Sequence, residues 1–443
     1  MKLPEQVLLL MDALERAGFS VYAVGGCVRD ALLGLTPHDY DLCTDATPTQ
    51  MHRVFSGLPL VTDGEKHGTV GVILDHRMYE ITTFRTEGNY SDSRHPDRVE
   101  FVRDICQDLA RRDFTVNAMA YHPKAGYIDP FGGREDLTKR VLRCVGDPQK
   151  RFTEDALRIL RGVRFAARFD LTPDSATEEA MTTLAPLLDK LARERVFDEL
   201  CKLLLWANAP LLLRFAPVLL QAVPALKPCY GFHQHTVHHA YDVYTHSAHV
   251  VAAVPAELPL RWAALLHDIG KPATFTLDDR GCGHFYGHAQ VGAEMADEVL
   301  LQLKAPTTLR QQVCLLIRAH MHPLEPNRKQ LRRVLSKWGM DTVLQLKALQ
   351  QADFTCTGVT GDHADFAAVT QLLEELEKEN ACLHIRDLAI DGSGLQRLGF
   401  TPGPRLGACL NYLLEQVLEE TLPNTPEALA EEAMKFLTRE GSL

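Results

Sequence analysis

The sequence predicts an α/β domain followed by an all-helical remainder. Residues 20–145 alternate short β-rich runs, such as VYAV, TVGVIL, MYEITTF and RVEFV, with helical patterns and turn clusters. A chain of 443 residues exceeds the length that one core usually supports, so several domains are expected. From Thr153 onward helical spacing dominates, beginning with Leu157, Leu160, Val163 and Ala167.

Composition excludes the disordered and membrane-spanning classes. With 46% hydrophobic and 24% charged residues, and no apolar run near the ~20 residues of a membrane span, the chain is typical of globular proteins. Glu5, Asp12 and Glu15 interrupt the N-terminal apolar stretch at helical spacing, which fits an amphipathic helix better than a signal peptide. The 11 cysteines are odd in number and include no CxxC pair, which indicates reduced core thiols. We expect a cytoplasmic protein without a membrane partner, and its oligomeric state stays open.

Charge and histidine are unevenly distributed along the chain. The net charge is −11, yet residues 139–168 hold nine lysines and arginines against three acidic residues. Any binding of nucleic acid must therefore use a local basic patch. Eleven of the 19 histidines lie between His233 and His322, which predicts a ligand-binding region. The segments at 221–235 and 379–394 have the composition of linkers.

The segment VYAVGGCVRDALLGLTPHDYDLCT predicts a strand, a glycine turn, a helix, a second turn and a second strand. Asp39 and Asp41 are two apart and share a face of the second strand, where two carboxylates can hold Mg²⁺. Two divalent ions that bridge a nucleoside triphosphate and an attacking hydroxyl are a general solution for phosphoryl transfer. Gly25 and Gly26 would let backbone N–H groups approach the phosphates, with Arg29 as counter-charge. Taken alone, such a carboxylate pair also fits an ordinary turn.

Further segments extend this pattern in a fixed order. RRDFTVNAMA, IDPFGGREDL and RFTEDALRILRGVRF follow at 111–120, 128–137 and 151–165. Together they resemble the head and neck motifs of class II tRNA nucleotidyltransferases, the CCA-adding enzymes related to bacterial poly(A) polymerases. LARERVFDELCKLL resembles the last neck motif, and residues 388–424 are similar to the tail of Gram-positive-type members. The resemblance implies an α/β nucleotidyltransferase head with a mixed sheet, an all-α neck or body and an α-helical tail.

The resemblance implies roles for residues of the head. Asp39 and Asp41 match the metal-binding carboxylates. Glu80 is our candidate for a third carboxylate, and an exposed strand residue is the equally good alternative. Asp129 and Asp136 match a motif that couples head to neck. The family motif that holds the ribose and triphosphate is matched by Arg111, Arg112, Asp113 and Asn117. The alternative is a capped, solvated helix start.

Glu154, Asp155 and Arg158 match the motif that selects the nucleotide. Asp155 and Arg158 are three apart, so we expect them on one helix with neighbouring side chains, and a solvated salt bridge is the alternative. A carboxylate only accepts and a guanidinium only donates, so the pair complements the amino donor and ring-nitrogen acceptor of C and A. U and G leave both groups unmatched, at roughly 1–3 kcal/mol for each buried group. The basic face continues toward triphosphate or tRNA phosphates through Arg161, Arg164 and Arg168.

A second group of candidate residues lies in the histidine-rich part. Adjacent His267 and Asp268 point in two directions on a regular helix, so both bind one ion only at a kink or between several helices. Imidazole and carboxylate suit a divalent transition metal, or Mg²⁺ with fewer nitrogens. The pattern resembles the HD-domain metal-dependent phosphohydrolases, which implies an α-helical HD domain; satisfied core histidines are the alternative. The matched ligands are His246, His267, Asp268 and Asp353, with His288 and His320 as further or second-metal ligands and Lys271 as a phosphate contact.

These assignments predict four domains. They are a nucleotidyltransferase head at 1–145, a neck or body for nucleotide selection and RNA binding at 146–225, an HD domain at 226–375 and a tRNA-binding tail at 376–443. The expected function is protein-templated addition of CCA to the 3′ end of tRNA from CTP and ATP with Mg²⁺. The HD domain is expected to repair 3′ ends or 2′,3′-cyclic phosphates.

Two alternatives remain open at this point. An enzyme of narrower output, which adds only CC or only A or makes poly(A), is the close one. The segment at 84–101 resembles the flexible loop that CC-adding members lack, so full CCA addition is favoured. The alternative of another class is a regulatory RNA-binding protein whose only chemistry is HD hydrolysis, and the intact Asp39 and Asp41 pair argues against it.

Overall fold

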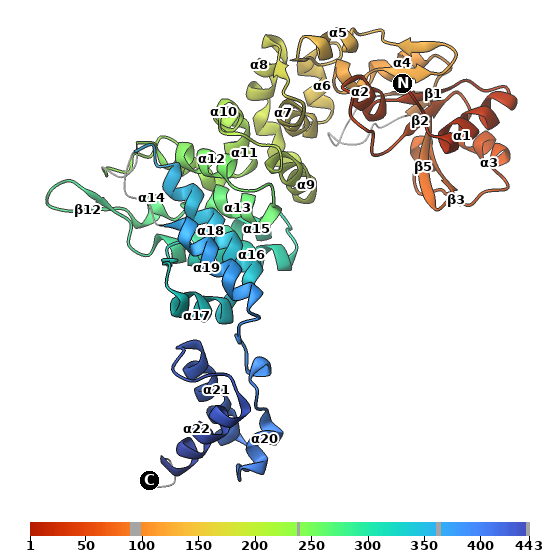
Figure 1. The fold of residues 1–443 in the computed structure, drawn as a ribbon. Helices are drawn as coiled ribbons and strands as arrows, with labels where there is room; N and C mark the ends of the chain where they lie inside the picture. Colours follow the sequence, from red (N-terminus) through yellow and green to blue (C-terminus); the bar gives the residue numbers. More distant parts are fainter. Residues whose placement is uncertain (89–98, 237–239, 360–364, 440–443) are drawn as a thin grey trace. The chain divides into compact units, whose positions relative to one another are not determined.

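The computed structural model confirms the predicted fold class, because a mixed sheet with helices comes first and helices follow (Figure 1). The structure describes residues 1–88, 99–236, 240–359 and 365–439. The chain separates into two compact units. The first comprises Met1–Lys227 with Val299–Pro306, and the second comprises Pro228–Glu298 with Thr307–Leu443.

A seven-stranded sheet forms the head, with the strand order β3-β4-β5-β2-β1-β8-β9. Strands β2 and β5 pair in parallel, whereas the other neighbours pair antiparallel. β5 shows the alternation that the sequence predicted, with Tyr79 and Ile81 buried and Glu80 exposed between them. The strands are β1 Val21–Val24, β2 Asp41–Thr44, β3 Leu60–Val61, β4 Thr69–Leu74, β5 Arg77–Thr83, β8 Ala120–His122 and β9 Gly126–Ile128.

Helices and short elements connect the strands of the head. The amphipathic N-terminal helix is confirmed as α1, which buries Val7, Leu10 and Leu14. Strand β6 (Arg85–Glu87) pairs with β7 (Val99–Phe101) on either side of the predicted flexible loop, whose residues 89–98 lie outside the described residues. The helices are α1 Glu5–Arg16, α2 Gly26–Leu32, α3 Pro48–Val54, α4 Ile105–Ala110 and α5 Gly133–Thr138, with 3₁₀ turns η1 Glu65–His67 and η2 Thr115–Asn117.

The neck follows the head within the first unit and is helical. Helices α7 and α9 pack against each other through apolar faces that include Val163 and Leu200. The predicted linker at 221–235 contains the boundary between the two units. The elements are α6 Pro148–Glu154, α7 Leu157–Phe169, α8 Ser175–Thr183, α9 Arg193–Leu204, α10 Ala209–Arg214 and α11 Ala216–Ala222, with η3 Ala185–Lys190, η4 Pro224–Cys229 and the parallel pair β10 Val141–Leu142 and β11 Thr172–Pro173.

The second unit is a helical bundle with one hairpin. Helices α12, α13, α16 and α18 pack together (Figure 1), and the fully buried Trp262 and Leu266 contribute to their core. Strands β12 (Thr276–Leu277) and β13 (Gly283–His284) form the hairpin. The helices are α12 Val243–Ala253, α13 Leu258–Leu266, α14 Lys271–Thr274, α15 His288–Gln302, α16 Thr307–Ala319, α17 Arg328–Trp338, α18 Met340–Thr355 and α19 Phe366–Lys378.

The tail has a hydrophobic core of its own. The segment at 379–394 was predicted to be a linker, and this is wrong, because its Cys382, Leu388 and Ile390 are buried in that core. Glycine and charged residues gave the segment the composition of a linker, but its apolar residues pack against the following helices. The elements are η5 Ile385–Asp387, α20 Gly392–Arg397, α21 Pro404–Leu418 and α22 Pro426–Arg439.

Candidate active site and metal centre

Sheet register brings two of the three predicted carboxylates of the head together. The expectation that Asp39 lies on the second strand is wrong, because β2 begins at Asp41; Asp39 is exposed and lies 3.1 Å from Nδ1 of His38. Leu42 pairs with Ile81 in parallel, so Asp41 and Glu80, the preceding residues of β2 and β5, are neighbours on one face. Desolvation of its carboxyl group, followed by repulsion from Glu80, raises the pKa of Asp41, whereas Arg112 opposes the shift. Asp39 adds to this repulsion from two positions earlier. The cluster is therefore a region of concentrated negative charge that a divalent cation would neutralise.

The glycine turn after β1 lies beside this cluster. Val24 pairs with Asp41 across β1 and β2, and Gly25 follows with φ +72°. A Cβ at Gly25 would lie 2.6 Å from Nη1 of Arg112. Both the left-handed backbone and the close guanidinium therefore require glycine at this position. The turn thus leaves room for Arg112 at the edge of the carboxylate cluster.

Arg29 is placed differently from the expectation that it faces the phosphates. It is buried, its Nη2 and Nε donate to Oδ1 of Asp30 at 2.6 and 2.9 Å, and its Nη1 donates to Asn117 at 2.5 Å. Its guanidinium also stacks over the ring of Phe169 in the neck, 4.1 Å from the ring centroid. Because these partners occupy the guanidinium, Arg29 joins the head to the neck in this structure.

Asp113 and Asn117 continue the same network. One carboxylate oxygen of Asp113 accepts from the Asn117 amide at 3.0 Å, and the other accepts from Arg161 on α7 at 2.6 Å. Burial opposes ionisation, but Arg161 and the Asn117 amide hold the pKa of Asp113 well below its ordinary value. The groups expected to hold ribose and triphosphate all have protein partners in this structure. Asp113 and Asn117 belong to this network, and Arg111 and Arg112 pair with the two oxygens of Asp108 at 2.9 and 3.5 Å.

The helix expected to carry both Asp155 and Arg158 is broken, so that expectation is wrong. Helix α6 ends at Glu154, and Asp155 adopts an extended conformation with φ −141° and ψ 103°. Its Oδ1 then accepts from the backbone N–H of Leu157 at 3.0 Å, which starts α7 as a helix cap does. Apolar spacing continues across the break, which is why the periodicity did not reveal it.

Asp155 and Arg158, the residues expected to select the nucleotide as a neighbouring pair, are held by different partners. Arg158 donates to Glu154 at 2.9 Å and to the carbonyl of Arg111 at 3.2 Å. Asp155 accepts from Arg195 of α9 at 3.2 Å. Each predicted residue is thus held by a separate neighbour. Arg195 lies in the segment LARERVFDELCKLL, which resembles the last neck motif, but its contact with Asp155 spans 40 residues and leaves no local pattern.

Arg164 is buried rather than presented to phosphates. Its Nε donates to Glu199 of α9 at 2.6 Å, and side-chain exposure is 10% for Arg164 and 6% for Glu199. The sequence contains a signal for this pair, since Glu199 lies in the apolar stripe that Val196, Leu200 and Leu203 form on α9. A charged residue in such a stripe indicates a buried partner.

Replacing Glu199 with Ala is expected to lower the free energy of unfolding by about 3–5 kcal/mol, because it leaves the Arg164 charge buried without a carboxylate. Chemical denaturation of the purified protein measures the effect. Glu135→Ala is the matched control, since Glu135 pairs with Lys139 on an exposed helix and its loss should leave stability unchanged within error. Equal stability of both variants would show that the buried pair does not stabilise the neck.

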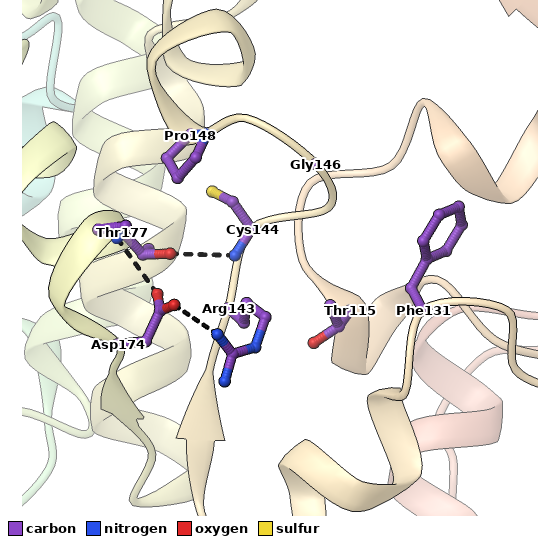
Figure 2. A pocket seen from close by; sticks show the side chains of 9 residues that line it. Thr115, Phe131, Arg143, Cys144, Gly146, Pro148, Asp174 and Thr177 are labelled. Carbon is purple, nitrogen blue, oxygen red and sulfur yellow. Dashed lines mark hydrogen bonds and ion pairs between the residues drawn. The ribbon is translucent and has the colours of Figure 1, made fainter.

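A cavity of about 200 Å³ lies where the head meets the neck (Figure 2). Arg143 on its wall donates to Asp174 of the neck at 2.6 Å and pairs with Asp136 of the head at 3.2 Å. Asp136 also accepts from the Thr115 hydroxyl at 2.7 Å. Asp129, in contrast, accepts from two backbone N–H groups at the start of α5. Of the two predicted coupling residues, Asp136 is the one that an ion pair connects to the neck.

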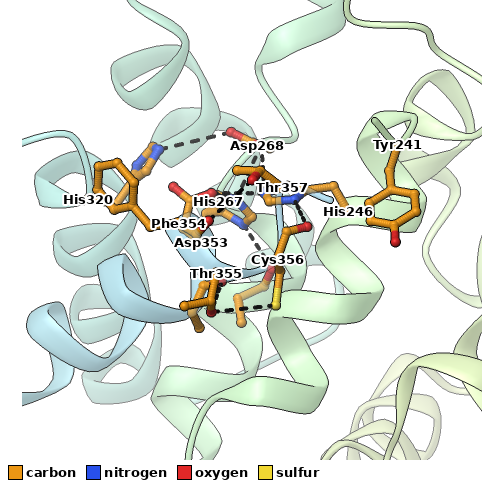
Figure 3. A network of polar contacts seen from close by, with 12 residues as sticks. Tyr241, His246, His267, Asp268, His320, Asp353, Phe354, Thr355, Cys356 and Thr357 are labelled. Atoms are coloured by element: carbon orange, nitrogen blue, oxygen red, sulfur yellow. Dashed lines mark hydrogen bonds and ion pairs between the residues drawn. The ribbon is translucent and has the colours of Figure 1, made fainter. Parts of the chain in front are cut away.

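The predicted metal ligands of the second unit, which are histidines and aspartates, lie close together in the structure (Figure 3). Helix α13 ends at Leu266, so His267 and Asp268 lie at the break that a shared ion requires. Asp268 lies between two sets of histidines, with one oxygen 3.2 Å from His267 and the other 3.5 Å from His288. His246 contacts Asp353 at 2.9 Å. The donor atoms within each set lie within 4.8 Å of one another, and the sets are His246, His267 and Asp268, and Asp268, His288 and His320.

Backbone contacts orient all four rings of this centre in the same way. In each ring, Nδ1 lies within hydrogen-bond distance of a backbone carbonyl, so that Nδ1 carries the proton as donor and Nε2 faces the aspartates. The Nε2 atoms of His288 and His320 are 3.3 Å apart. Two donors on one tetrahedral ion lie about 3.3 Å apart when each is 2.0–2.1 Å from it. Ring orientation and spacing both fit metal ligation.

Two buried atoms of the centre, Nε2 of His267 and Oδ2 of Asp268, make no hydrogen bond of good geometry. They lie 3.2 Å apart, and the carboxylate oxygen is also 2.7 Å from Nζ of Lys271. Burial alone would lower the pKa of His267, but Asp268 and Asp353 raise it to about 10. Burial and the nearby His267 lower the pKa of His320 to about 4. Buried imidazole and carboxylate donors crowded together in this way fit a divalent ion.

Lys271, the predicted phosphate contact, lies next to Asp268 of the histidine centre. Its Nζ is 2.7 Å from Oδ2 of Asp268 and donates to the side-chain oxygen of Gln234 at 2.9 Å. Gln234 is buried and was not singled out in the sequence, since an isolated glutamine carries no distinctive pattern. The lysine therefore adds one positive charge to the rim of the centre.

The fold and these sites define a nucleotidyltransferase. Residues 21–143 match the family model described as poly A polymerase head domain, and residues 170–214 match that of the RNA and SrmB-binding site of polymerase A. Residues 284–433 match the model of tRNA nucleotidyltransferase domain 2. The chain belongs to the family of CCA-adding enzymes. It is 35% identical over 433 residues to the CCA-adding enzyme of Streptococcus sanguinis, with 96% of each chain covered.

Another relative and two solved structures similar to this chain are also named CCA-adding enzymes. The CCA-adding enzyme of Limosilactobacillus reuteri is 35% identical and covers 98% of this chain and 96% of its own. The crystal structure of the Bacillus stearothermophilus CCA-adding enzyme in complex with CTP has a TM-score of 0.70 and 28% identity, and all of both chains is covered. The Thermotoga maritima CCA-adding enzyme complexed with tRNA, at 23% identity and a TM-score of 0.61, shares the fold over 98% of this chain and 96% of its own. Among the described helices, none is both long and apolar enough to cross a membrane.

Proposed function

We propose that this enzyme adds CCA to the 3′ end of tRNA from CTP and ATP without a nucleic-acid template. The observation that supports this most directly is the cluster of Asp39, Asp41 and Glu80 beside the Gly25 turn. Relatives named CCA-adding enzymes cover nearly the whole chain, and the proposal extends to this protein the activity that their name states.

Asp39 and Asp41 would hold Mg²⁺, with Glu80 as the third carboxylate. When bound, the ion would offset the triphosphate charge and favour ionisation of the attacking 3′ hydroxyl. Arg112, at the edge of the cluster, would neutralise phosphate oxygens and orient the triphosphate for in-line attack. The glycine turn would let the phosphates approach the backbone closely. Binding and orientation are thus the work of the head residues.

Nucleotide choice would fall to Asp155 and Arg158. The Asp155 carboxylate would accept from the exocyclic amino group of C or A, and the Arg158 guanidinium would donate to the ring nitrogen. Their fixed partners support this role: Arg195 restrains Asp155, whereas Glu154 and the carbonyl of Arg111 restrain Arg158. A preorganised pair of this kind rejects U and G because their groups would stay unpaired.

The remaining domains would bind tRNA and repair its end. The neck at 146–225 and the tail at 376–443 would contact tRNA, in keeping with the matches to RNA-binding and tRNA nucleotidyltransferase models. The part at 226–375 would be an HD phosphohydrolase. His246, His267, Asp268 and Asp353 would hold a divalent ion, with His288 and His320 as further ligands and Lys271 near a phosphate. When bound, the ion would activate water for hydrolysis of the P–O3′ bond of a 2′,3′-cyclic phosphate, which frees the 3′ hydroxyl and leaves the phosphate on O2′.

The test incubates the purified protein with tRNAs that lack zero to three 3′ residues, with CTP and ATP supplied separately and together. Full CCA addition predicts that CTP alone extends the shortest tRNA by two residues and that ATP adds one residue only after CC. Extension that stops at CC, extension only of CC-ending tRNA, or long A tracts would each replace the proposal with the corresponding narrower enzyme. No incorporation with any substrate would favour the regulatory RNA-binding protein.

A further inference from the structure

The hairpin of the second unit carries three metal-ligand side chains that the proposed functions do not use. Strands β12 and β13 pair antiparallel, with Thr276 opposite His284. The backbone N–H of Asp278 donates to the carbonyl of Cys282 at 3.0 Å, and Gly281 closes the turn with φ +75°. The hairpin is therefore a defined turn rather than an extended loop.

Three different donors gather at this hairpin. Cys282 directly precedes β13 and His284 ends it, while Asp278 follows β12 at the other end of the turn. Nε2 of His284 is 3.1 Å from Oδ2 of Asp278. The thiol, the imidazole and the carboxylate donor atoms all lie within 4.8 Å of one another.

Backbone contacts already fix the carboxylate in a ligand orientation. Oδ1 of Asp278 accepts from the N–H groups of Arg280 and Cys282 at 2.9 and 2.8 Å. Oδ2 is thereby aimed at His284 and stays available to a cation. Such support of one carboxylate oxygen while the other coordinates is common in metal sites. The spacing of 3.1 Å is close to the separation of about 3.3 Å that two donors adopt on one tetrahedral ion.

Cys282 is also unlike most cysteines of this protein. Eight of the eleven are buried, as expected for core thiols, whereas Cys282 is partly exposed next to a histidine and an aspartate. Core packing therefore does not account for it. A thiolate with an imidazole selects borderline-soft divalent ions over Mg²⁺ or Ca²⁺.

We propose that Asp278, Cys282 and His284 bind one divalent transition-metal ion, of the Zn²⁺ or Co²⁺ type, at a site separate from the histidine centre. Binding releases the Cys282 proton and leaves the fourth coordination position to water. The ion ties both ends of the turn and so makes the hairpin rigid.

The hairpin adjoins the wall of the histidine centre, which gives this ion a structural consequence. The N–H of Gly283 donates to the carbonyl of His235 at 2.7 Å, and a Cβ at Gly283 would lie 2.2 Å from the carbonyl oxygen of Gln234. Gln234 in turn accepts from Lys271, which pairs with Asp268. A rigid hairpin thus holds Gln234 and Lys271 in place at the rim of the centre.

The test is a Co²⁺ titration of the reduced, metal-free full-length protein, followed by near-ultraviolet absorption. Thiolate bound to Co²⁺ gives a sulfur-to-metal charge-transfer band, which the histidine centre cannot give through its nitrogen and oxygen donors. The expected result is a band that saturates at one Co²⁺ ion per chain and disappears when Zn²⁺ displaces the Co²⁺. Cys282→Ser should abolish it, and His284→Ala should weaken Co²⁺ binding at this band by about 10–100-fold or more.

Two matched controls make the result decisive. Cys106→Ser and Cys356→Ser change the other partly exposed cysteines and should keep the band at full height. Circular dichroism of every variant verifies folding. A band that survives in Cys282→Ser, a band lost in Cys356→Ser instead, or no band at all overturns the proposal. The outcome is independent of phosphohydrolase activity, because it reads the sulfur ligand directly.

Discussion

Replacing Asp41 with Asn is expected to lower incorporation of both C and A by about 10³-fold or more, because the loss of a metal-binding carboxylate removes several kcal/mol of charge stabilisation. Asp39→Asn should act in the same direction. Binding of tRNA should persist in both variants, because the substitutions leave every lysine and arginine in place. Single-turnover incorporation and gel-shift binding, measured at one fixed salt concentration, provide the two readouts.

Loss of folding would not explain such a result. Desolvation and the neighbouring Glu80 raise the pKa of Asp41, so its ionised form destabilises the folded head at neutral pH. The neutral amide removes this repulsion, and the melting temperature of Asp41→Asn should be equal to or above that of the wild type. Asp63→Asn is the matched control, because Asp63 is exposed in the same head. Near-normal turnover of Asp41→Asn would contradict the metal assignment.

Substitution of the histidine centre should separate the two proposed activities. His267→Ala and Asp268→Ala each remove a matched ligand of the centre. A tRNA that ends in a 2′,3′-cyclic phosphate has no free 3′ hydroxyl, so the wild type should extend it only after hydrolysis. Each variant should extend it at least about 100-fold more slowly, while a tRNA with a 3′ hydroxyl is extended within about twofold of the wild-type rate.

Metal analysis and a milder variant complete this experiment. Asp268 is buried against His267 and Lys271, so Asp268→Ala leaves uncompensated charge and also tests stability. His246→Gln keeps the core neutral and should lose metal without unfolding. Equal extension of the cyclic-phosphate tRNA by wild type and variants would show that the centre does not repair ends. Absence of bound metal in the wild type, measured by mass spectrometry, would instead contradict ligation.

The sequence was most informative where local order determines geometry. Two-residue spacing predicted that Asp39 and Asp41 share a strand face, but β2 begins at Asp41. The alternation predicted for MYEITTF holds in β5, and the register of β2 with β5 places Glu80 beside Asp41. Helix α13 ends at Leu266, so His267 and Asp268 lie at the helix break that joint binding of one ion would need. In these elements the backbone period anticipated which side chains could meet.

The sequence was least informative where a side chain ends a helix or finds a distant partner. The apolar spacing gives no sign of the break between α6 and α7, which arises because the Asp155 carboxylate accepts from the N–H of Leu157 and caps the second helix. Arg161 and Arg164 counted as free positive charges in the sequence, yet each pairs with a carboxylate from another element. Such pairings depend on how elements pack. For Arg164 the sequence offered only an indirect signal, the position of Glu199 in an apolar stripe, and it did not identify the partner.

The ion pairs between head and neck bear on how this protein can be divided or recombined. Asp113 of the head depends on Arg161, and Asp136 reaches Asp174 through Arg143. A fragment cut at residue 145 would keep the buried carboxylate of Asp113 and lose its arginine, which costs several kcal/mol. A cut after Lys227 keeps both pairs together, although the first unit also includes Val299–Pro306. Exchange between related enzymes should therefore move the head together with its own neck.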